Sequence, residues 1–295
     1  MLHKLVLGTV QLGMPYGINN TSGQPSNEEA FALLREAWTL GIRTLDTADA
    51  YGTAIERIGD FHAHHNATSS ERFRIITKFH ADSGTELLTK TPQTLTKLHV
   101  PSLTCYQYHR FSDVSAFPHI HNQLQTLKEQ GVIERIGVSV YTNDEIAAAA
   151  ASPLIDVIQF PFNLLDNMRL RGDAMRHAKD CGKELHTRSV FLQGLFFKSP
   201  EDFPAKLAPL QSAIQRLHRL CKSSNFALRT MQELALNYAL HNPLIEAVLF
   251  GVETASQLTE TLGAVRDNFD PALAREIEAL TVPDYQLLNP VHWSS

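Results

Sequence analysis

The feature that most constrains the fold is a regular alternation of short apolar runs and helix-patterned segments along the whole chain. Eight runs bounded by turn-forming residues have the pattern of buried strands, and the segments between them carry apolar residues at helical spacing. The runs are residues 4–10, 43–46, 73–78, 103–109, 133–139, 155–160, 184–189 and 247–250. Eight strand–helix units in succession are typical of a parallel sheet closed into a barrel, and a doubly wound sheet is the alternative. We therefore expect one α/β domain over residues 1–295, a (β/α)8 or TIM barrel.

Four of the expected helix starts carry a capping box, which supports the same alternation. In a capping box a Ser or Thr side chain accepts from the third helical N–H, and a Glu or Gln reaches back. Each box falls just after an expected strand-to-helix loop. The pairs are Ser26 with Glu29, Thr53 with Glu56, Thr142 with Glu145, and Thr254 with Gln257.

Composition and charge exclude several classes of function. The chain has 43% hydrophobic residues and a net charge of −5, so it can bury a large core but offers no basic field to nucleic acid. No apolar stretch reaches the length of a membrane span, and no signal-peptide pattern opens the chain, so we expect a cytoplasmic protein. The three cysteines, Cys105, Cys181 and Cys221, form no C-x-x-C pair, which argues against a disulfide framework or a thiolate zinc site.

Histidines cluster at two places that invite a metal-site interpretation. His62 and His65 are the only pair in the first cluster that shares a helix face, and His64 lies between them with no acid or cysteine to complete a site. His119 and His121 are two residues apart before a helix expected at 122–130. We predict no metal site, and we interpret both clusters as solvated helix ends.

Ionisable side chains at three neighbouring strand ends carry the chemistry. In a barrel, reactive groups lie on the loops that leave the carboxyl ends of the strands. Asp46, Lys78 and His109 end strands two, three and four, and Tyr51 follows Asp46 by five residues. Each has a structural explanation alone, as turn former, surface lysine, core histidine or half-buried aromatic, but their joint placement favours a site. A phenol donates a proton at neutral pH only with help from an adjacent ammonium, which Lys78 can supply, so the four predict carbonyl reduction.

Motifs along nearly the whole chain resemble those of the aldo-keto reductases. The resemblance implies a (β/α)8 barrel that binds a nicotinamide nucleotide without a Rossmann domain, and no G-x-G-x-x-G motif occurs here. It implies that Tyr51 is the general acid, that Lys78 and Asp46 tune it, and that His109 orients the carbonyl. The matching stretches are residues 7–13, 46–48 with 51–52, 77–78, 108–109, 131–133 with 135–139, 159–160 with 163–164, and 188–194.

The resemblance also implies a set of nucleotide contacts. Ser139 and Gln159 correspond to the pair that binds the carboxamide, and Arg188 stands where a side chain covers the nicotinamide ring. Ser189 and the Gln193–Gly194 turn correspond to pyrophosphate contacts, although that turn is also explained as a simple loop. The full expected set is Gly8, Thr9, Val10, Asp46, Ser139, Gln159, Arg188, Ser189, Gln193, Gly194, Phe250, Gly251, Glu253, Gln257 and Glu260.

Two departures from the family pattern bear on the nucleotide. Val140 follows Ser139 where many members carry Asn, so one carboxamide hydrogen bond is missing or replaced. Gly251, Glu253 and Gln257 stand where NADPH-preferring members carry Lys or Arg. A carboxylate repels a 2′-phosphate but accepts from a free 2′-hydroxyl, so we predict a relaxed or NAD(H)-leaning preference. The alternative is that Glu253 faces solvent, which leaves the choice between NADP(H) and NAD(H) open.

Two further segments are candidates for shaping a substrate pocket. The loop at 14–25 is long for a strand-to-helix connection, and its Tyr16 is expected to line the pocket with Tyr51 and His109. The tail at 282–293 carries Tyr285 and Trp293, and it either folds over the cleft or packs on the outside of the barrel.

The sequence therefore predicts an NAD(P)(H)-dependent oxidoreductase that interconverts a small aldehyde or ketone and its alcohol. One alternative is a regulatory protein that binds the nucleotide on the same scaffold with little turnover. Another is a lyase in which Lys78 forms a Schiff base. The identity of the substrate and the oligomeric state are left open by the pattern.

Overall fold

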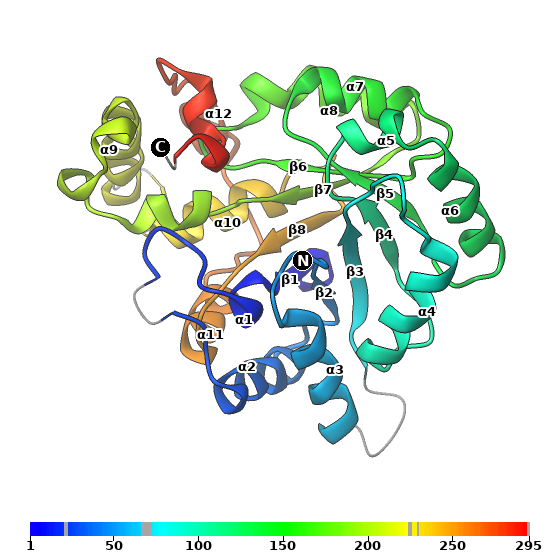
Figure 1. Cartoon of the computed structure of the whole chain (residues 1–295). Coiled ribbons are helices and arrows are strands. Elements are labelled where there is room, and N and C mark those ends of the chain that lie inside the picture. The colour runs from blue at the N-terminus through cyan, green and yellow to red at the C-terminus, as the bar shows by residue number, and fades with distance from the viewer. Residues whose placement is uncertain (21–22, 66–71, 224–225, 229, 294–295) are drawn as a thin grey trace.

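The computed structural model is a closed barrel of eight parallel strands, and it describes residues 1–20, 23–65, 72–223, 226–228 and 230–293. The strands pair in chain order from β1 to β8, and β8 closes onto β1 (Figure 1). The expected barrel is thus confirmed, and the doubly wound alternative is wrong. The strands are β1 Leu5–Gly8, β2 Thr44–Asp46, β3 Arg74–Phe79, β4 Cys105–Tyr108, β5 Ile136–Ser139, β6 Val157–Pro161, β7 Glu184–Arg188 and β8 Ala247–Phe250.

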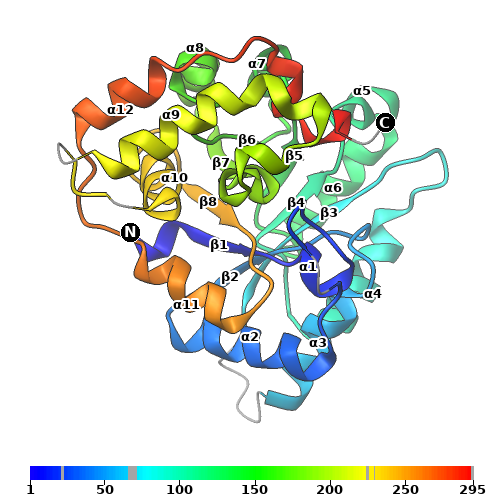
Figure 2. The same ribbon diagram turned by 90° about the vertical axis from the view of Figure 1, so that its left-hand side faces the viewer.

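Helices surround the barrel on its outside (Figures 1 and 2). The last of the barrel helices, α11, packs against α2, so the ring closes where the end of the chain meets its beginning. In the described part of the segment between β7 and β8, the α-helices are α9 and α10, and three short 3-10 helices precede them. The helices are α1 Val10–Gly13, α2 Asn27–Thr39, α3 Ala54–His65, α4 Leu87–Leu98, α5 Ser112–Ala116, α6 His119–Glu129, α7 Asn143–Ala151, α8 Met168–Asp180, α9 Gln211–Lys222, α10 Met231–Leu240, α11 Ala255–Gly263 and α12 Pro271–Glu278.

The core lies in two places, inside the barrel and between the barrel and its helices. Side chains fill the barrel itself, which makes it a packed core rather than a channel. Gly137 is required in this layer, because a Cβ there would come within 2.7 Å of the Gln107 side chain. The interior apolar cluster consists of Val6, Ile76, Cys105, Val157, Ala247 and Leu249.

Capping side chains fix several of the helix starts. The boxes at Ser26 before α2 and at Thr142 before α7 form in full, as expected. The Thr254 hydroxyl accepts from the Gln257 N–H, but the Gln257 side chain accepts from the N–H of Glu253 instead of that of Thr254. The Thr53 hydroxyl accepts from Gln24, while Glu56 pairs with Lys97. A further full box, Thr230 with Glu233, opens α10 and was not expected from the sequence.

His62 corrects one interpretation of the sequence. Instead of a solvated helix end, its side chain is buried between α3 and the segment before β3. Nδ1 lies 2.7 Å from the carbonyl oxygen of Leu98, and Nε2 accepts from the backbone N–H of Phe73. Burial therefore lowers the pKa of His62. Its role is structural.

The part of the chain that the structure describes holds no cluster of metal-ligating side chains and no helix able to span a membrane. Within those residues, no three His, Cys, Asp or Glu side chains are grouped to hold a metal ion. No helix among them is long and apolar enough to span a membrane. Thr21 and Ser22, which belong to the loop at 14–25, lie outside the described residues.

Candidate active site

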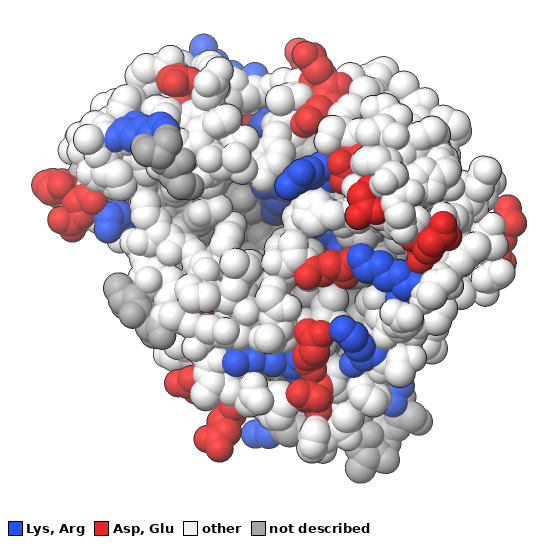
Figure 3. All heavy atoms as spheres, viewed as in Figure 1, with Lys and Arg blue, Asp and Glu red and all other residues white. Residues whose placement is uncertain are grey.

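A cleft of about 750 Å³ opens over the carboxyl ends of the strands. Figure 3 shows the surface hollowed near the centre of the molecule, with basic atoms on the wall. Every residue expected to act in catalysis, to bind the nucleotide or to line the substrate pocket lies on the wall of this one cleft. The structure thus brings the whole expected set together, from Gly8 near the end of β1 to Glu260 on α11.

Asp46 and Lys78 form a buried ion pair at the floor of the cleft. The Lys78 ammonium donates to Oδ1 of Asp46, and the amide of Gln159 donates to Oδ2 at 3.0 Å. The side chains of Lys78 and Asp46 expose 2% and 4% of their surface. Burial lowers the pKa of Lys78, and the facing carboxylate opposes that effect. Each charge therefore depends on the other.

Two glycines place Tyr51 above this pair. Gly52 adopts φ +54°, and a Cβ on it would come within 2.2 Å of the Gly13 carbonyl oxygen. A Cβ on Gly13 would in turn meet the Tyr51 carbonyl oxygen at 1.7 Å. The segments after β1 and β2 can approach this closely only because Gly13 and Gly52 have no Cβ atom. The result puts the Lys78 ammonium 5.6 Å from the centroid of the Tyr51 ring.

The electrostatics of Tyr51 differ from the expectation. Burial raises the pKa of Tyr51, the carboxylate of Asp46 raises it further, and the nearby guanidinium of Arg188 opposes both. The net lowering of this pKa that was expected from the adjacent ammonium of Lys78 is thus wrong for the free protein, because burial and Asp46 outweigh the nearby positive charges. The sequence did not show it, because the burial of Tyr51 and its distance from Asp46 become visible only in the fold. Tyr51 keeps its proton firmly.

His109 lies beside Tyr51 with its ring held on two sides. The Tyr51 ring meets it edge to face at 6.0 Å between centroids, and the His80 ring stacks on it at 4.4 Å and 10°. Burial lowers the pKa of His109 to about 3, assisted by the charges of Lys78, His80, Arg188 and Arg110. His109 is therefore a neutral imidazole at physiological pH.

Arg188 ends β7 and stacks on a residue that the sequence analysis did not single out. Its guanidinium carbon lies 4.2 Å from the centroid of the Tyr141 ring, and an N–H donates to the carbonyl oxygen of Val140 at 3.1 Å. Tyr141 also lines the cleft. The backbone at Val140, where the family pattern differs, thus orients Arg188.

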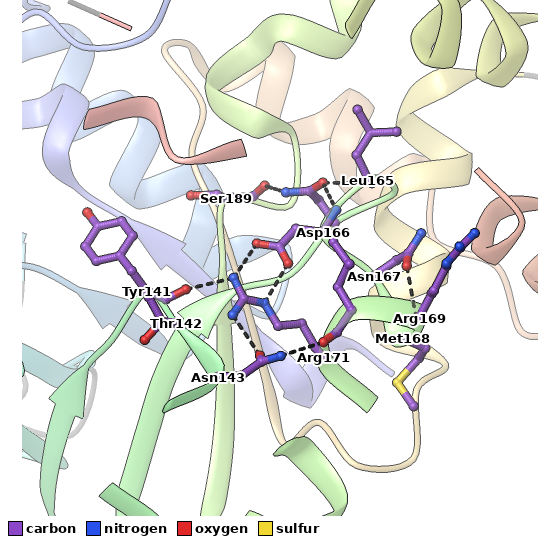
Figure 4. Close-up of polar contacts among 12 residues, drawn as sticks. Tyr141, Thr142, Asn143, Leu165, Asp166, Asn167, Met168, Arg169, Arg171 and Ser189 are labelled. Carbon is purple, nitrogen blue, oxygen red and sulfur yellow. Dashed lines mark hydrogen bonds and ion pairs between the residues drawn. The ribbon is translucent and has the colours of Figure 1, made fainter. Parts of the chain in front are cut away.

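A polar network behind Tyr141 ties together the loops after β5, β6 and β7 (Figure 4). Arg171 holds buried Asp166 through two hydrogen bonds of 2.6 and 2.8 Å and donates to the Tyr141 carbonyl oxygen at 2.8 Å. The Asn163 amide donates to the carbonyl oxygen of Ser189. Burial raises the pKa of Asp166, and Arg171 opposes that effect. The network fixes the backbone on which Arg188 and Ser189 stand.

The segment after β7 is strained and is held by the loop after β1. Ser189, Leu192 and Gln193 have φ of 60°, 47° and 52°, a region that residues other than glycine rarely adopt. The Gln193 carbonyl oxygen accepts from the N–H of Ile18 at 3.1 Å, and the Gln193 amide donates to the Tyr16 hydroxyl at 2.7 Å. The Asn19 amide donates to Gly194. Runs of such conformations turn backbone N–H groups toward a common side, where they can bind an anion.

The far end of the cleft, at the start of α11, is acidic and polar. Glu253, Gln257 and Glu260 line it, and burial raises the pKa of Glu253. Glu253 therefore belongs to the wall of the cleft. Among the described residues that line the cleft, the lysines and arginines are Lys78 and Arg188, and both lie at the catalytic end.

Several lining residues were missed by the sequence analysis. Pro290 and Val291 from the tail line the cleft, so the tail reaches over it, whereas the sequence left its placement open. The signal for these residues in the sequence is weak, because most of them are apolar, small or amide side chains that occur equally often away from a cleft. The missed set is Gln11, Gly17, Asn19, Tyr141, Val190, Phe191, Phe197, Gln232, Leu249, Val252, Thr261, Pro290 and Val291.

Comparison with known proteins agrees with this architecture. The chain is 25% identical to L-galactose dehydrogenase of Arabidopsis thaliana over 92% of its length and 90% of that protein's. It is 25% identical to the NADP(+) aldo-keto reductase yakc of Schizosaccharomyces pombe over 86% and 83%. The holo structure of aldo-keto reductase AKR11C1 from Bacillus halodurans superposes with a TM-score of 0.73, at 20% identity, over 96% and 95% of the two chains. The model of the aldo/keto reductase family matches residues 4–281, and the chain belongs to that family.

Proposed function

We propose that the protein interconverts an aldehyde or ketone and its alcohol with a nicotinamide nucleotide, and that Tyr51 is the general acid and base. The observation that carries this proposal is the placement of Tyr51 and His109 over the buried Lys78–Asp46 pair in one cleft. A neutral phenol and a neutral imidazole side by side can both donate to one carbonyl oxygen.

In this proposal the neutral side chains of Tyr51 and His109 donate to the substrate, and the cations Lys78 and Arg188 stabilise the negative charge that forms. In reduction the carbonyl carbon gains a hydride, and its oxygen takes the phenolic proton of Tyr51. The phenolate left behind is stabilised by the nearby cations Lys78 and Arg188, and it regains a proton from water. His109 donates to the same oxygen as negative charge develops there. In oxidation each proton moves in the opposite direction.

The residues of the cleft fit a nicotinamide nucleotide. Oε1 of Gln159 is buried at the floor of the cleft without a hydrogen-bond partner among the described residues, so it can accept from a carboxamide. In the strained turn at Ser189 to Gly194, the N–H groups of Leu192 and Gly194 bond within the turn, which leaves those of Val190 and Phe191 for a pyrophosphate. The start of α11 lies at the far end of the cleft, where its N-terminal N–H groups would favour negative charge. The bound nucleotide would supply the hydride.

Within this proposal, NAD(H) is the favoured nucleotide. Glu253 and Glu260 line the end of the cleft that the adenosine ribose would occupy, and the lysine and arginine in the described lining lie at the opposite end. A free 2′-hydroxyl can donate to Glu253, whereas a 2′-phosphate would meet its charge. The Schizosaccharomyces pombe relative is named for NADP(+), so both nucleotides belong in the test.

The experiment is a titration of the protein with NADH and with NADPH, followed by quenching of protein fluorescence, for wild type and Tyr51→Phe. Turnover is then assayed with L-galactose and NAD+, after the Arabidopsis relative, and with butanal and NADH. We expect both proteins to bind nucleotide alike, and Tyr51→Phe to lose about 10²- to 10⁴-fold in kcat. Absence of binding by either nucleotide would overturn the proposal. Trapping of a substrate on Lys78 by borohydride would replace it with a lyase.

A further inference from the structure

The two ring nitrogens of His109 have different surroundings: Nδ1 is buried, and Nε2 is open to the cleft. The ring lines the cleft, yet its Nδ1 is buried and has no hydrogen-bond partner among the described residues. Nε2 is therefore the nitrogen that the cleft can reach. A neutral imidazole carries its proton on one nitrogen only, so the identity of that nitrogen decides whether His109 donates or accepts at the cleft.

The burial of Nδ1 selects between the two tautomers. With the proton on Nδ1, an N–H would be buried without an acceptor, and a lone pair would face the cleft. With the proton on Nε2, the N–H reaches water or a substrate oxygen, and the buried nitrogen keeps an unpaired lone pair, which proteins tolerate better than a buried N–H without an acceptor. The second arrangement is the one that donates to a carbonyl.

The position of the ring, however, is not fixed by a hydrogen bond to Nδ1. In most histidines that act as donors, a hydrogen bond on the other nitrogen fixes the ring and its tautomer. Here the His109 ring has two aromatic contacts instead. The Tyr51 ring packs edge to face against it, and the His80 ring stacks parallel to it at 4.4 Å between centroids. His80 follows directly after β3, so the stack ties the end of β3 to the end of β4.

We propose that His80 is a positioning residue, which by stacking holds the His109 ring with Nε2–H directed into the cleft. This inference rests on the proposed function, in which His109 donates to the carbonyl oxygen. His80 itself is not a catalytic residue in this proposal, because it acts through His109. A displacement of about 1 Å or a rotation of about 20° in a hydrogen-bond donor of this kind lowers the reaction rate. Loss of the stack is therefore expected to slow the reaction, although His80 does not line the cleft.

The charges around the ring support a neutral His109 in this orientation. Lys78 and His80 face it from the end of β3, Arg110 from the loop after β4, and Arg188 from the end of β7. Burial and the coulombic effects of these four groups lower the pKa of His109 to about 3. A second proton on the ring is thus disfavoured from every side.

Two substitutions separate stacking from any other role of His80. His80→Phe keeps a planar ring and removes the nitrogens, whereas His80→Ala removes the ring. We expect His80→Ala to lower kcat by about 10- to 100-fold with the nucleotide Kd unchanged, and His80→Phe to retain most of the activity. Equal losses in the two variants, or no loss in either, would overturn the stacking role.

Nitrogen NMR of the imidazoles gives a readout that needs no turnover. The His109 signals, identified by their disappearance in His109→Gln, are expected to show a single Nε2–H tautomer in wild type and in His80→Phe. In His80→Ala they should show mixed tautomers or a shift toward Nδ1–H. An unchanged tautomer in His80→Ala would contradict the inference. Because this readout is independent of substrate, it stands or fails separately from the proposed function.

A matched control lies outside the cleft. His241 stacks on Phe269 at 6.2 Å and 24°, and its Nε2 lies 2.9 Å from the carbonyl oxygen of Arg266. His241→Ala therefore removes a comparable histidine stack away from the catalytic end. We expect it to leave kcat and the His109 signals as in wild type. If His241→Ala changed kcat and the His109 signals as much as His80→Ala does, the effect of His80→Ala would reflect a general loss of stability and not a positioning role.

Discussion

Lys78 and Asp46 form an ion pair inside the barrel, where their side chains expose only 2% and 4% of their surface. Gln159 from β6 completes the group by donating to the free carboxylate oxygen. Charges removed from water to this extent gain little from each other overall, but each becomes costly when its partner is lost. The pair is therefore a sensitive point for both stability and chemistry.

Lys78→Met should be more destabilising than the double variant Asp46→Asn with Lys78→Met. The single change leaves a carboxylate buried without its cation, which costs about 3–5 kcal/mol in the free energy of unfolding. The double change removes both charges and should recover part of that loss. Urea unfolding of wild type, Lys78→Met, Asp46→Asn and the double variant measures this. As a control, Glu134→Gln breaks the exposed pair with Arg74 and should cost about 0–1 kcal/mol. Additive effects at positions 46 and 78 would contradict the coupling.

The pH dependence of carbonyl reduction follows from the two perturbed groups. The pKa of His109 is lowered to about 3, so this ring stays neutral at every pH above roughly 4. The pKa of Tyr51 is raised above its ordinary value of about 10, so the phenol keeps its proton through neutral and mildly alkaline solution. We expect kcat for reduction to be flat between about pH 5 and 9. A descending limb near neutral pH would show that another group controls the proton transfer.

The fold could be predicted from the sequence because each strand carries its own apolar pattern. The residues at which the strands begin and end could not be predicted. The expected runs 103–109 and 133–139 begin earlier than β4 and β5. Leu103 and Ile133 do pair, but only as an isolated bridge separated from the strands that follow. An apolar pattern records burial, and here Leu103 and Ile133 are buried before the continuous ladder begins. Boundaries therefore depend on pairing, which the sequence does not display.

Part of the candidate site could likewise be predicted from the sequence, and part could not. Asp46, Lys78 and His109 could be placed because strand order alone brings neighbouring strand ends together. His80, Tyr141 and the tail could not, because their positions depend on loop conformation. His62 was misassigned for a related reason: an amphipathic pattern shows a helix but not how far the next segment covers it.

Arg171→Lys should weaken the protein although it keeps the charge. The planar guanidinium contacts both oxygens of Asp166 and the Tyr141 carbonyl at once, and an ammonium cannot reproduce that fork. We expect unfolding to become easier by about 1–3 kcal/mol, because Asp166 stays buried with poorer pairing. Nucleotide binding should weaken as well, since the backbone of Tyr141 and Ser189 loses its support. Thermal unfolding and the fluorescence titration measure the two effects. Retention of wild-type nucleotide affinity would separate this network from the cleft.

Glu253→Arg should shift nucleotide preference toward NADPH. The substitution replaces a carboxylate on the wall of the cleft, near the start of α11, by a guanidinium that can bind a 2′-phosphate through two hydrogen bonds. We expect the ratio of NADPH to NADH affinity to rise by about tenfold or more, as read from the two fluorescence titrations. Glu129→Arg makes the same charge change on the exposed end of α6 and should leave the ratio unaltered. Equal shifts in the two variants would indicate a general effect of charge, and no shift in Glu253→Arg would mean that the ribose lies away from this side chain.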